Sequence, residues 1–227
     1  ARKLQYADLT NRVVIDKPVA VRSVNGPALT LIAGAQDPNP FALLQYSSIR
    51  GVHLGDGASL SGFTITNGHT LVLTDLPIFG DRGYELNGGG IWCAIDATVS
   101  NCVLTGCDAT SFGGGVHRGI LRNCLLSGNT ANAGGGAFDA QLFDCAVVAN
   151  TAAGGGGGAF SGRLVRCYVA TNDASFGGGV SAGELEDCVI RTNFAYNGGG
   201  VYTSLVTRCV ITANAALRGG GAHSATL

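Results

Sequence analysis

The feature that most constrains this chain is an internal repeat of roughly 21 residues, a length typical of solenoid proteins. The stretch "FGGGVHRGILRNCLLSGNTA" at 112–131 returns as "FGGGVSAGELEDCVIRTNFA" at 176–195. Both copies hold a glycine triplet, a cysteine and an asparagine at the same offsets. A unit this short cannot bury an apolar face by itself, so successive copies must stack on one another to make a core.

A column of cysteines and a column of asparagines mark the repeat along the chain. The cysteines from Cys102 to Cys209 follow one another at nearly equal steps, and a glycine triplet stands ahead of each. In the first unit Cys107 occupies the place of the asparagine. The other units hold the pairs Cys124/Asn129, Cys145/Asn150, Cys167/Asn172, Cys188/Asn193 and Cys209/Asn214.

The composition decides which repeat architecture fits. Helical repeats are about 33 residues or longer and need good helix formers. This chain instead has 37 glycines among 227 residues, and its repeats are rich in Val, Ile and Thr, which favour strands. The L-x-x-L-x-L pattern of leucine-rich repeats is absent. The sequence therefore predicts an all-β fold, a parallel β-helix (β-solenoid) of about nine ~21-residue coils stacked at ~4.8 Å.

Residues at the same offset in successive coils lie above one another, so the columns of the solenoid can be assigned from the sequence. We expect the core to consist of the cysteine column and of four apolar columns that begin at Ile91, Val99, Leu104 and Ala109. The asparagine column is expected to form an amide ladder, in which each side chain hydrogen-bonds to the coils above and below.

Two further columns are expected to point outward. The residues directly before the last four cysteines alternate in sign, which predicts an ion-pair ladder of Asp144, Arg166, Asp187 and Arg208. Each exposed pair contributes under ~1 kcal/mol, so the ladder mainly fixes the register of the coils. The residues directly after the cysteines are apolar, and either a partner covers them or the bend of the coil turns them partly inward, which we favour. They are Val103, Leu125, Ala146, Tyr168, Val189 and Val210.

The chain is predicted to be one β-helix domain over residues 1–227, and to be a segment of a longer protein. Residues 1–70 lack the glycine triplet but keep strand signals, and Phe63 and Ile65 fit the columns of the later coils. This part is expected to form irregular N-terminal coils. Residues 70–85 interrupt the period and are expected to form an inserted loop, while residues 86–227 form the regular coils. Long insertions are where solenoids often carry function.

Composition and cysteine spacing exclude several classes of partner. The formal net charge is −1 and no basic stripe is present, so we expect no nucleic acid. No run of about 18 apolar residues predicts a transmembrane helix. The cysteine spacing never gives C-x-x-C, so neither a metal nor a cofactor is expected. We expect free, buried thiols, with a disulfide between Cys93 and Cys107 as an open alternative.

Three stretches of the sequence carry a family resemblance. They are "VVIDKPVAVRSVNGPALTLIAG" at 13–34, "GASLSGFTITNG" at 57–68 and the serial "GGG(V/A)…NCxLxGN" units. These motifs resemble right-handed parallel β-helix repeat proteins of bacterial cell envelopes, and are similar to those of polymorphic outer-membrane protein and autotransporter passengers. The resemblance spans nearly the whole chain. It implies a right-handed coil and a secreted or cell-surface location, and it implies no particular activity.

The candidate binding residues lie in one outward column, two residues after each glycine triplet. Aromatic side chains dominate this column and could stack on sugar rings. The residues proposed to bind a saccharide are Trp92, His117, Phe138, Phe160 and Tyr202. No residue is predicted to be catalytic, because the acidic residues are scattered and Glu184, Glu186 and Asp187 form the single tight acidic group.

The function predicted from the sequence is structural. We expect a non-catalytic, adhesin-like solenoid segment of a secreted or surface bacterial protein, which could stack end to end with its own copies into fibres. The alternative is a carbohydrate-binding or polysaccharide-degrading lyase or hydrolase with a surface polysaccharide as its partner. An ice-binding solenoid would need repeated flat Thr-x-Thr ranks, and "TIT" occurs once, at 64–66.

Overall fold

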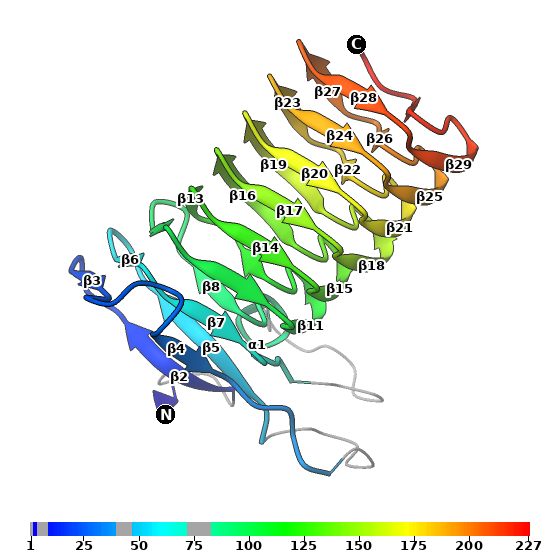
Figure 1. The fold of residues 1–227 in the computed structure, drawn as a ribbon. Coiled ribbons are helices and arrows are strands. Elements are labelled where there is room, and N and C mark those ends of the chain that lie inside the picture. The colour runs from blue at the N-terminus through cyan, green and yellow to red at the C-terminus, as the bar shows by residue number, and fades with distance from the viewer. Residues whose placement is uncertain (1, 4–8, 40–46, 72–82) are drawn as a thin grey trace.

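The structure, a computed structural model, describes residues 2–3, 9–39, 47–71 and 83–227. Apart from the four-residue helix α1 (Gly83–Leu86), the elements in this part of the chain are strands. They form three sheets that stack as a parallel β-solenoid, with coils of about 22 residues (Figure 1). The predicted fold class is confirmed. No helix in the described ranges has the length and apolar character needed to cross a membrane.

Each sheet gathers the strands that occupy one side of the coil. The first has 16 strands, and they are β1 (Arg2–Lys3), β2 (Thr10–Ile15), β3 (Ala20–Arg22), β5 (Ile49–Leu54), β6 (Ser59–Ser61), β8 (Ile91–Cys93), β9 (Thr98–Ser100), β12 (Val116–His117), β13 (Ile120–Arg122), β16 (Ala137–Phe143), β19 (Ala159–Val165), β22 (Val180–Ser181), β23 (Glu184–Glu186), β26 (Val201–Tyr202), β27 (Leu205–Thr207) and β30 (Ala222–His223). The second has eight, and they are β4 (Leu31–Ala33), β7 (Thr64–Thr66), β10 (Val103–Thr105), β14 (Leu125–Ser127), β17 (Ala146–Val148), β20 (Tyr168–Ala170), β24 (Val189–Arg191) and β28 (Val210–Thr212). The third has six, and they are β11 (Asp108–Phe112), β15 (Thr130–Ala133), β18 (Thr151–Gly155), β21 (Asp173–Phe176), β25 (Phe194–Asn197) and β29 (Ala215–Arg218).

The number of complete coils is smaller than the sequence predicted. Six coils, from β8 through β29, contribute strands to all three sheets, against about nine expected. The two preceding coils contribute to the first and second sheets, and at the place of the third sheet His69 makes an isolated bridge to Asp108. The third sheet begins where the glycine triplets begin, which is why the period overcounts complete coils.

The register of the strands reproduces the predicted columns. Leu104 pairs with Leu126, and Leu126 pairs with Val147, so equivalent residues lie directly above one another. The four apolar columns are buried along most of the solenoid, and Val116 and Leu121 have no exposed surface. The predicted core is therefore confirmed. Its columns keep apolar surface away from water without any element packed against the outside of the coil.

The asparagine side chains join consecutive coils inside the core. Asn129 Nδ2 donates to Asn150 Oδ1 at 2.9 Å, and the backbone N–H of Asn129 donates to the same oxygen at 3.0 Å. Asn150 Nδ2 also donates to the carbonyl of Leu126 at 3.0 Å. One buried side chain thus satisfies three polar groups, and the pattern continues as far as Asn214. At the start of the column, the backbone N–H of Cys107 donates to Asn129 Oδ1 at 3.0 Å.

The glycine triplets and the asparagines depend on each other. A Cβ on Gly158, the third residue of its triplet, would lie 2.6 Å from the carbonyl oxygen of Gly179 and 3.0 Å from Asn172 Nδ2. Gly113, the first residue of another triplet, has φ of +66°, a backbone conformation that L side chains rarely adopt. A side chain in the triplet would therefore push apart two coils that the asparagine holds together.

The alternating charges form two separate pairs. Arg166 donates to both carboxylate oxygens of Asp144, at 2.7 and 2.8 Å. Arg208 makes the same two-point contact with Asp187, at 2.7 and 2.9 Å. Each arginine reaches back to the preceding coil, and Arg166 attracts Asp187 only through the longer-range interaction of their charges. Register is thus set by two bidentate pairs rather than by one continuous ladder.

The cysteines form no disulfide. All eight are free, seven of them are buried and Cys209 is half-buried. This confirms the buried thiols that the sequence predicted, and it excludes the alternative of a disulfide between Cys93 and Cys107. Burial raises the pKa of Cys107 to about 12, so its thiol stays protonated at neutral pH.

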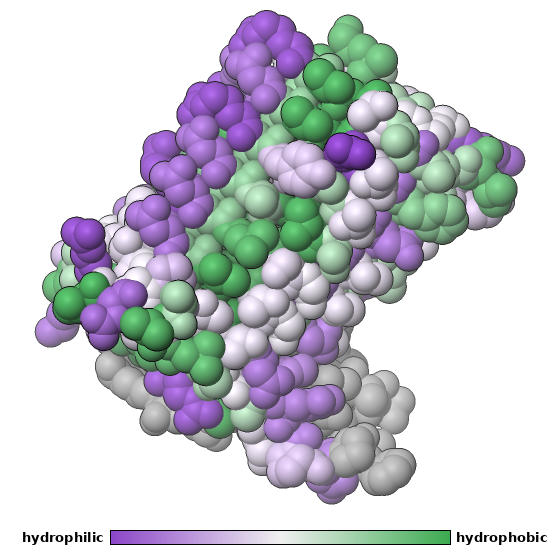
Figure 2. Space-filling view, viewed as in Figure 1, coloured by the Kyte–Doolittle hydropathy of each residue, from purple (hydrophilic) through white to green (hydrophobic). Residues whose placement is uncertain are grey.

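One outward column corrects the sequence analysis. Val103, Leu125 and Ala146 are half-buried, but the equivalent residues further along the chain point into solvent. Val210 is 58% exposed, so the bend of the coil does not turn this column inward along its whole length. Figure 2 shows the resulting apolar surface along the second sheet. The strand alternation decides the direction of these side chains, and the bend adds little.

The asparagine contacts give a prediction about stability. Replacing Asn150 with alanine leaves the N–H and Nδ2 groups of Asn129 and the carbonyl of Leu126 without their buried partner. We expect Asn150→Ala to lower the free energy of unfolding by about 3 kcal/mol, measured by urea denaturation. Asn214→Ala is the matched control, because its contacts are only partly buried and water can replace them. Equal losses at the two positions would contradict the role given to burial.

Candidate functional site

The candidate binding residues stack as rings along the solenoid. Strand pairing places His53, Trp92, His117 and Phe138 in one column. Trp92 and His53 have ring centroids 4.7 Å apart and planes 3° from parallel, and His117 and Phe138 are related in the same way at 5.6 Å and 5°. Phe138 and Phe160 follow at 5.4 Å and 2°. The ring faces are therefore turned toward neighbouring coils and away from a ligand on the side of the solenoid.

The column is not the exposed strip that the sequence predicted. Trp92 is 8% exposed and His117 is 5% exposed, because Tyr84 of helix α1 lies against Trp92 with a centroid distance of 4.6 Å. The column is also interrupted. Ser181 stands between Phe160 and Tyr202, and Tyr202 stacks on His223 at 5.5 Å instead. The five predicted residues therefore do not form one continuous surface.

A buried arginine fastens helix α1 to the solenoid. Arg50 is 1% exposed, and its Nε donates to the carbonyl of Gly88 at 2.9 Å. Its two terminal nitrogens donate to Asn11 Oδ1 at 2.9 Å, to the carbonyl of Asn87 at 2.8 Å and to the carbonyl of Tyr84. Three carbonyls at the end of α1 thus receive the donors that a helix end needs. The consequence is a fixed position for Tyr84 over Trp92.

The charge of Arg50 shapes the histidines around Trp92. Burial lowers the pKa of Arg50 to about 9, while Glu85 acts in the opposite direction, so the guanidinium is charged at neutral pH. Burial, together with nearby arginines, lowers the pKa of both His53 and His117 to about 4. Both imidazoles are therefore neutral at pH 7. The Nδ1 atom of each ring is buried without a hydrogen-bond partner in the described residues.

A pocket of about 310 Å³ opens beside this stack. Its lining combines aromatic side chains with polar ones, and the described lining residues are Tyr84, Asn87, Trp92, Phe112, His117, Arg118 and Phe138. Phe112 lies on Phe138 with a centroid distance of 4.4 Å and an angle of 17°. Arg118 Nε contacts Asp139 Oδ2 at 3.2 Å. The pocket joins the insertion to the first glycine-triplet coils.

The sequence pattern identifies three of these lining residues and misses the others. Trp92, His117 and Phe138 are found because they share a column. Phe112 is missed, although it and Phe176 both stand directly before a glycine triplet, which is a usable signal. The position of Tyr84 and Asn87 depends on Arg50, so no period reveals it. That arginine, within the otherwise apolar strand β5, is the signal that points to them.

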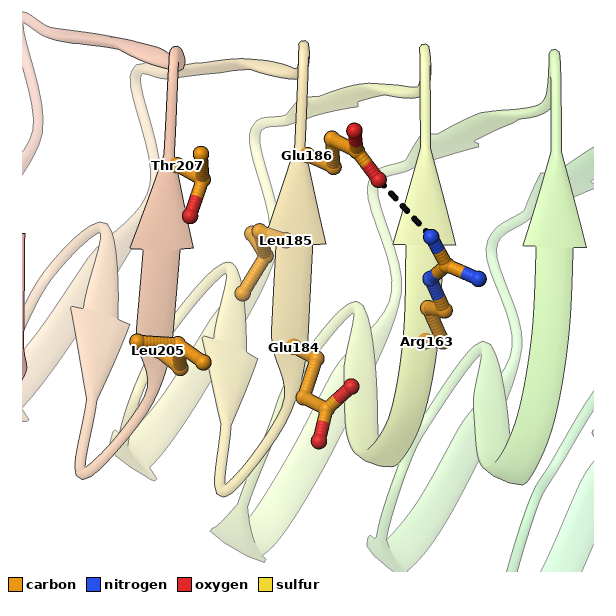
Figure 3. Close-up of a pocket in the computed structure, with 6 residues that line it drawn as sticks. All are labelled: Arg163, Glu184, Leu185, Glu186, Leu205 and Thr207. Carbon is orange, nitrogen blue, oxygen red and sulfur yellow. Dashed lines mark hydrogen bonds and ion pairs between the residues drawn. The ribbon is translucent and has the colours of Figure 1, made fainter.

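The tight acidic group lies elsewhere on the first sheet. Figure 3 shows Glu184 and Glu186 on the same strand, with Glu186 directed at Arg163. Glu186 lies between two arginines, 2.8 Å from Arg163 and 2.6 Å from Arg208. Hydrogen bonds from Arg208 and Arg163 lower the pKa of Glu186, and those from Arg208 lower the pKa of Asp187. These carboxylates stay ionised, which suits ion pairing and does not suit a general acid.

A second acidic residue of interest lies at the base of the insertion. Burial raises the pKa of Asp108, and His69 Nδ1 lies 3.9 Å from its carboxylate. Thr70 Oγ1, at the start of the insertion, contacts Thr110 Oγ1 at 3.3 Å. Residues 72–82, the greater part of the predicted loop at 70–85, lie outside the described residues. Within the described ranges, no group of three or more His, Cys, Asp or Glu side chains could hold a metal ion.

Comparisons of the chain with protein-family models, with curated proteins and with solved structures gave no match. The class that the fold defines is that of a parallel β-solenoid protein. The likeness to bacterial envelope repeats accordingly stays a resemblance in the sequence motifs. Because a fold alone does not imply a function, the side chains themselves must indicate one.

Arg50 supports a prediction about the position of helix α1. Arg50→Lys keeps a cation but loses the planar fork that reaches several acceptors. We expect the emission of Trp92, the one tryptophan in the chain, to shift to longer wavelength as Tyr84 moves away. We also expect a loss of about 3 kcal/mol in the free energy of unfolding, because buried acceptors lose their donors.

Arg12→Lys serves as the control for this experiment. Arg12 also donates to a backbone carbonyl, that of Ala33 at 2.7 Å, but in an exposed setting. Its replacement should change stability by less than about 0.5 kcal/mol and leave the tryptophan emission unchanged. An unchanged emission in Arg50→Lys would show that Arg50 does not position α1.

The neutral histidines predict a dependence of stability on pH. The folded-state pKa of His117 is about 4 against an ordinary value of 6.5, so the unfolded chain binds more protons between these values. Stability should therefore be complete above pH 6.5 and fall as the pH drops toward 4. His117→Phe should reduce this loss in a series of thermal melts, because phenylalanine continues the stack without a titrating group. His223→Phe, in the same column, should leave the loss unchanged, and an equal effect of both variants would refute the assignment.

Proposed function

We propose that this chain is a non-catalytic structural segment of a secreted or cell-surface β-solenoid protein, with an adhesin-like role. The observation that supports this most directly is where the polar side chains of the repeats go. The asparagines bond to the next coil, and Asp144 and Asp187 are each held by an arginine of the next coil. Polar groups that a catalytic solenoid would present to a substrate are here engaged in joining coils.

The state of the acidic residues also supports a non-catalytic role. Glycoside hydrolysis needs two carboxyl groups in different states, one protonated to act as an acid and one ionised. Glu186 and Asp187 both have a lowered pKa and both contact Arg208, so this group supplies two ionised members and no acid. Arginine contacts also compete with any substrate for the same oxygens.

The location and the self-assembly belong to the same proposal. The resemblance to bacterial envelope repeats supports a secreted or cell-surface location. End-to-end pairing is supported by the last coil, where Ile211 and Asn214 are partly exposed while their equivalents Ile190 and Asn193 are buried. A second copy could cover these groups with the same contacts that join coils within one chain.

A second candidate is a carbohydrate-binding or polysaccharide-degrading function. The aromatic pocket beside helix α1 favours binding. Asp108 favours degradation, since it is the acidic residue in the described ranges whose pKa is raised, and a general acid needs that property. It lies beside His69 at the base of the insertion.

The two candidates are separated by a panel of polysaccharides incubated with the purified chain. Newly formed chain ends and retained protein are followed together. The structural proposal expects no new chain ends on any polysaccharide over hours of incubation. New chain ends that disappear in Asp108→Asn would overturn it and place the chemistry at the base of the insertion. Asp173→Asn is the control, because Asp173 pairs by strand register within the same sheet as Asp108.

Self-assembly is tested on the same preparation by light scattering over a range of concentrations. End-to-end pairing expects the mean mass to rise with concentration. A chain that stays monomeric at the highest concentration would remove fibre formation from the proposal and leave the structural role of a single segment in place.

A further inference from the structure

The pocket beside helix α1 differs from the rest of the aromatic column in having ring faces that are not covered by another coil. Trp92 and His117 are almost completely buried within the stack. Tyr84 contacts Trp92 with a tilt of 31° and keeps 45% of its surface exposed. Phe112 lies on the outside of the column, with Phe138 beneath it. Tyr84 and Phe112 are therefore the side chains of the pocket that offer ring surface to a ligand.

The polar residues of the pocket supply hydrogen bonds beside these rings. Arg118 uses Nε for Asp139, so the rest of its guanidinium fork is available at the rim. Asn87 lines the pocket, and its backbone carbonyl is already fixed by Arg50. His117 is neutral at physiological pH, because burial and the nearby arginines lower its pKa. The pocket thus combines apolar ring surface with donors, and it needs no charge on the ligand.

A sugar ring matches this combination. One face of a pyranose carries C–H groups that pack on an aromatic ring, and its edge carries hydroxyls that accept hydrogen bonds from a guanidinium or an amide. A purely apolar ligand would leave Arg118 and Asn87 without a role. The pocket is also open along one side rather than enclosed, so the sugar could belong to a longer chain that continues across the solenoid.

We propose that the pocket between Tyr84 and Phe112 is a saccharide-binding site that takes one pyranose ring of a polysaccharide. Tyr84 and Phe112 contact the ring, Arg118 and Asn87 bond to its hydroxyls, and Arg50 positions the helix that carries Tyr84. This inference rests on the carbohydrate-binding candidate and is independent of the structural role. It moves the site from the stacked column named from the sequence to the side chains beside it.

Trp92 provides a direct readout of binding. It is the one tryptophan of the chain, and it lines the pocket under Tyr84. The full chain is titrated with hexamers of glucose, N-acetylglucosamine and galacturonic acid, and the emission of Trp92 is followed. At least one hexamer should change the emission in a saturable way. No change with any hexamer up to millimolar concentration would overturn the proposal.

Variants locate the site, with affinities measured by calorimetry because some variants alter the fluorescence itself. Tyr84→Ala and Phe112→Ala should each weaken binding roughly tenfold, the loss of about 1.4 kcal/mol expected for one stacked ring. Phe176→Ala is the matched control, since Phe176 also precedes a glycine triplet but contacts Tyr202 instead, at 5.3 Å. Its affinity should be unchanged. Thermal melts verify that each variant is folded.

The remaining outcomes separate this site from the proposed structural function. Arg118→Asn, which suits the left-handed backbone of that residue (φ of +63°), should weaken binding without a loss of stability. Equal affinity in Tyr84→Ala, Phe112→Ala and the unmodified chain would refute the site even if binding occurs. New chain ends would refute the non-catalytic function and leave the binding site standing, so the two failures can be told apart.

Discussion

The contact on which the solenoid depends is the buried amide that passes from one coil to the next. Each asparagine in the interior of the column answers two donors of one neighbouring coil and one carbonyl of another coil, in a core with no water to replace them. The glycine triplet is the other half of this contact, since a Cβ at Gly158 would reach both Asn172 and the next coil. The repeat length, the flat coil corners and the small core residues all follow from keeping that amide in place.

The insertion is stabilised by a different kind of interaction. The coils rely on contacts that recur in every repeat, whereas helix α1 is held by one buried guanidinium that occurs once. A charge placed there is tolerated because its donors all have acceptors and because Glu85 is near. The same charge keeps the histidines around Trp92 neutral. The functional pocket therefore forms where the repeat stops and a unique contact takes over.

The two regions also differ in how far the sequence predicts them. The cysteine, asparagine and leucine columns could be assigned in advance, because translation along one axis turns a sequence period into a spatial neighbour. Six complete coils instead of about nine, and an apolar column that stays outward at Val210, show the limits of counting and of local bend arguments. Tyr84 and Asn87 obey no period, so their place beside Trp92 follows only from the three-dimensional contact with Arg50.

The asparagine column also gives the solenoid a direction. In each contact the amide nitrogen belongs to the earlier coil and the oxygen to the later one, from Asn129 through Asn214. The small dipoles of these amides thus align head to tail along the axis and add to one another. The two ends of the stack are chemically unlike, one offering acceptors and the other donors. Any copy that joins such a stack must do so with the same polarity, as the next link in a one-way chain.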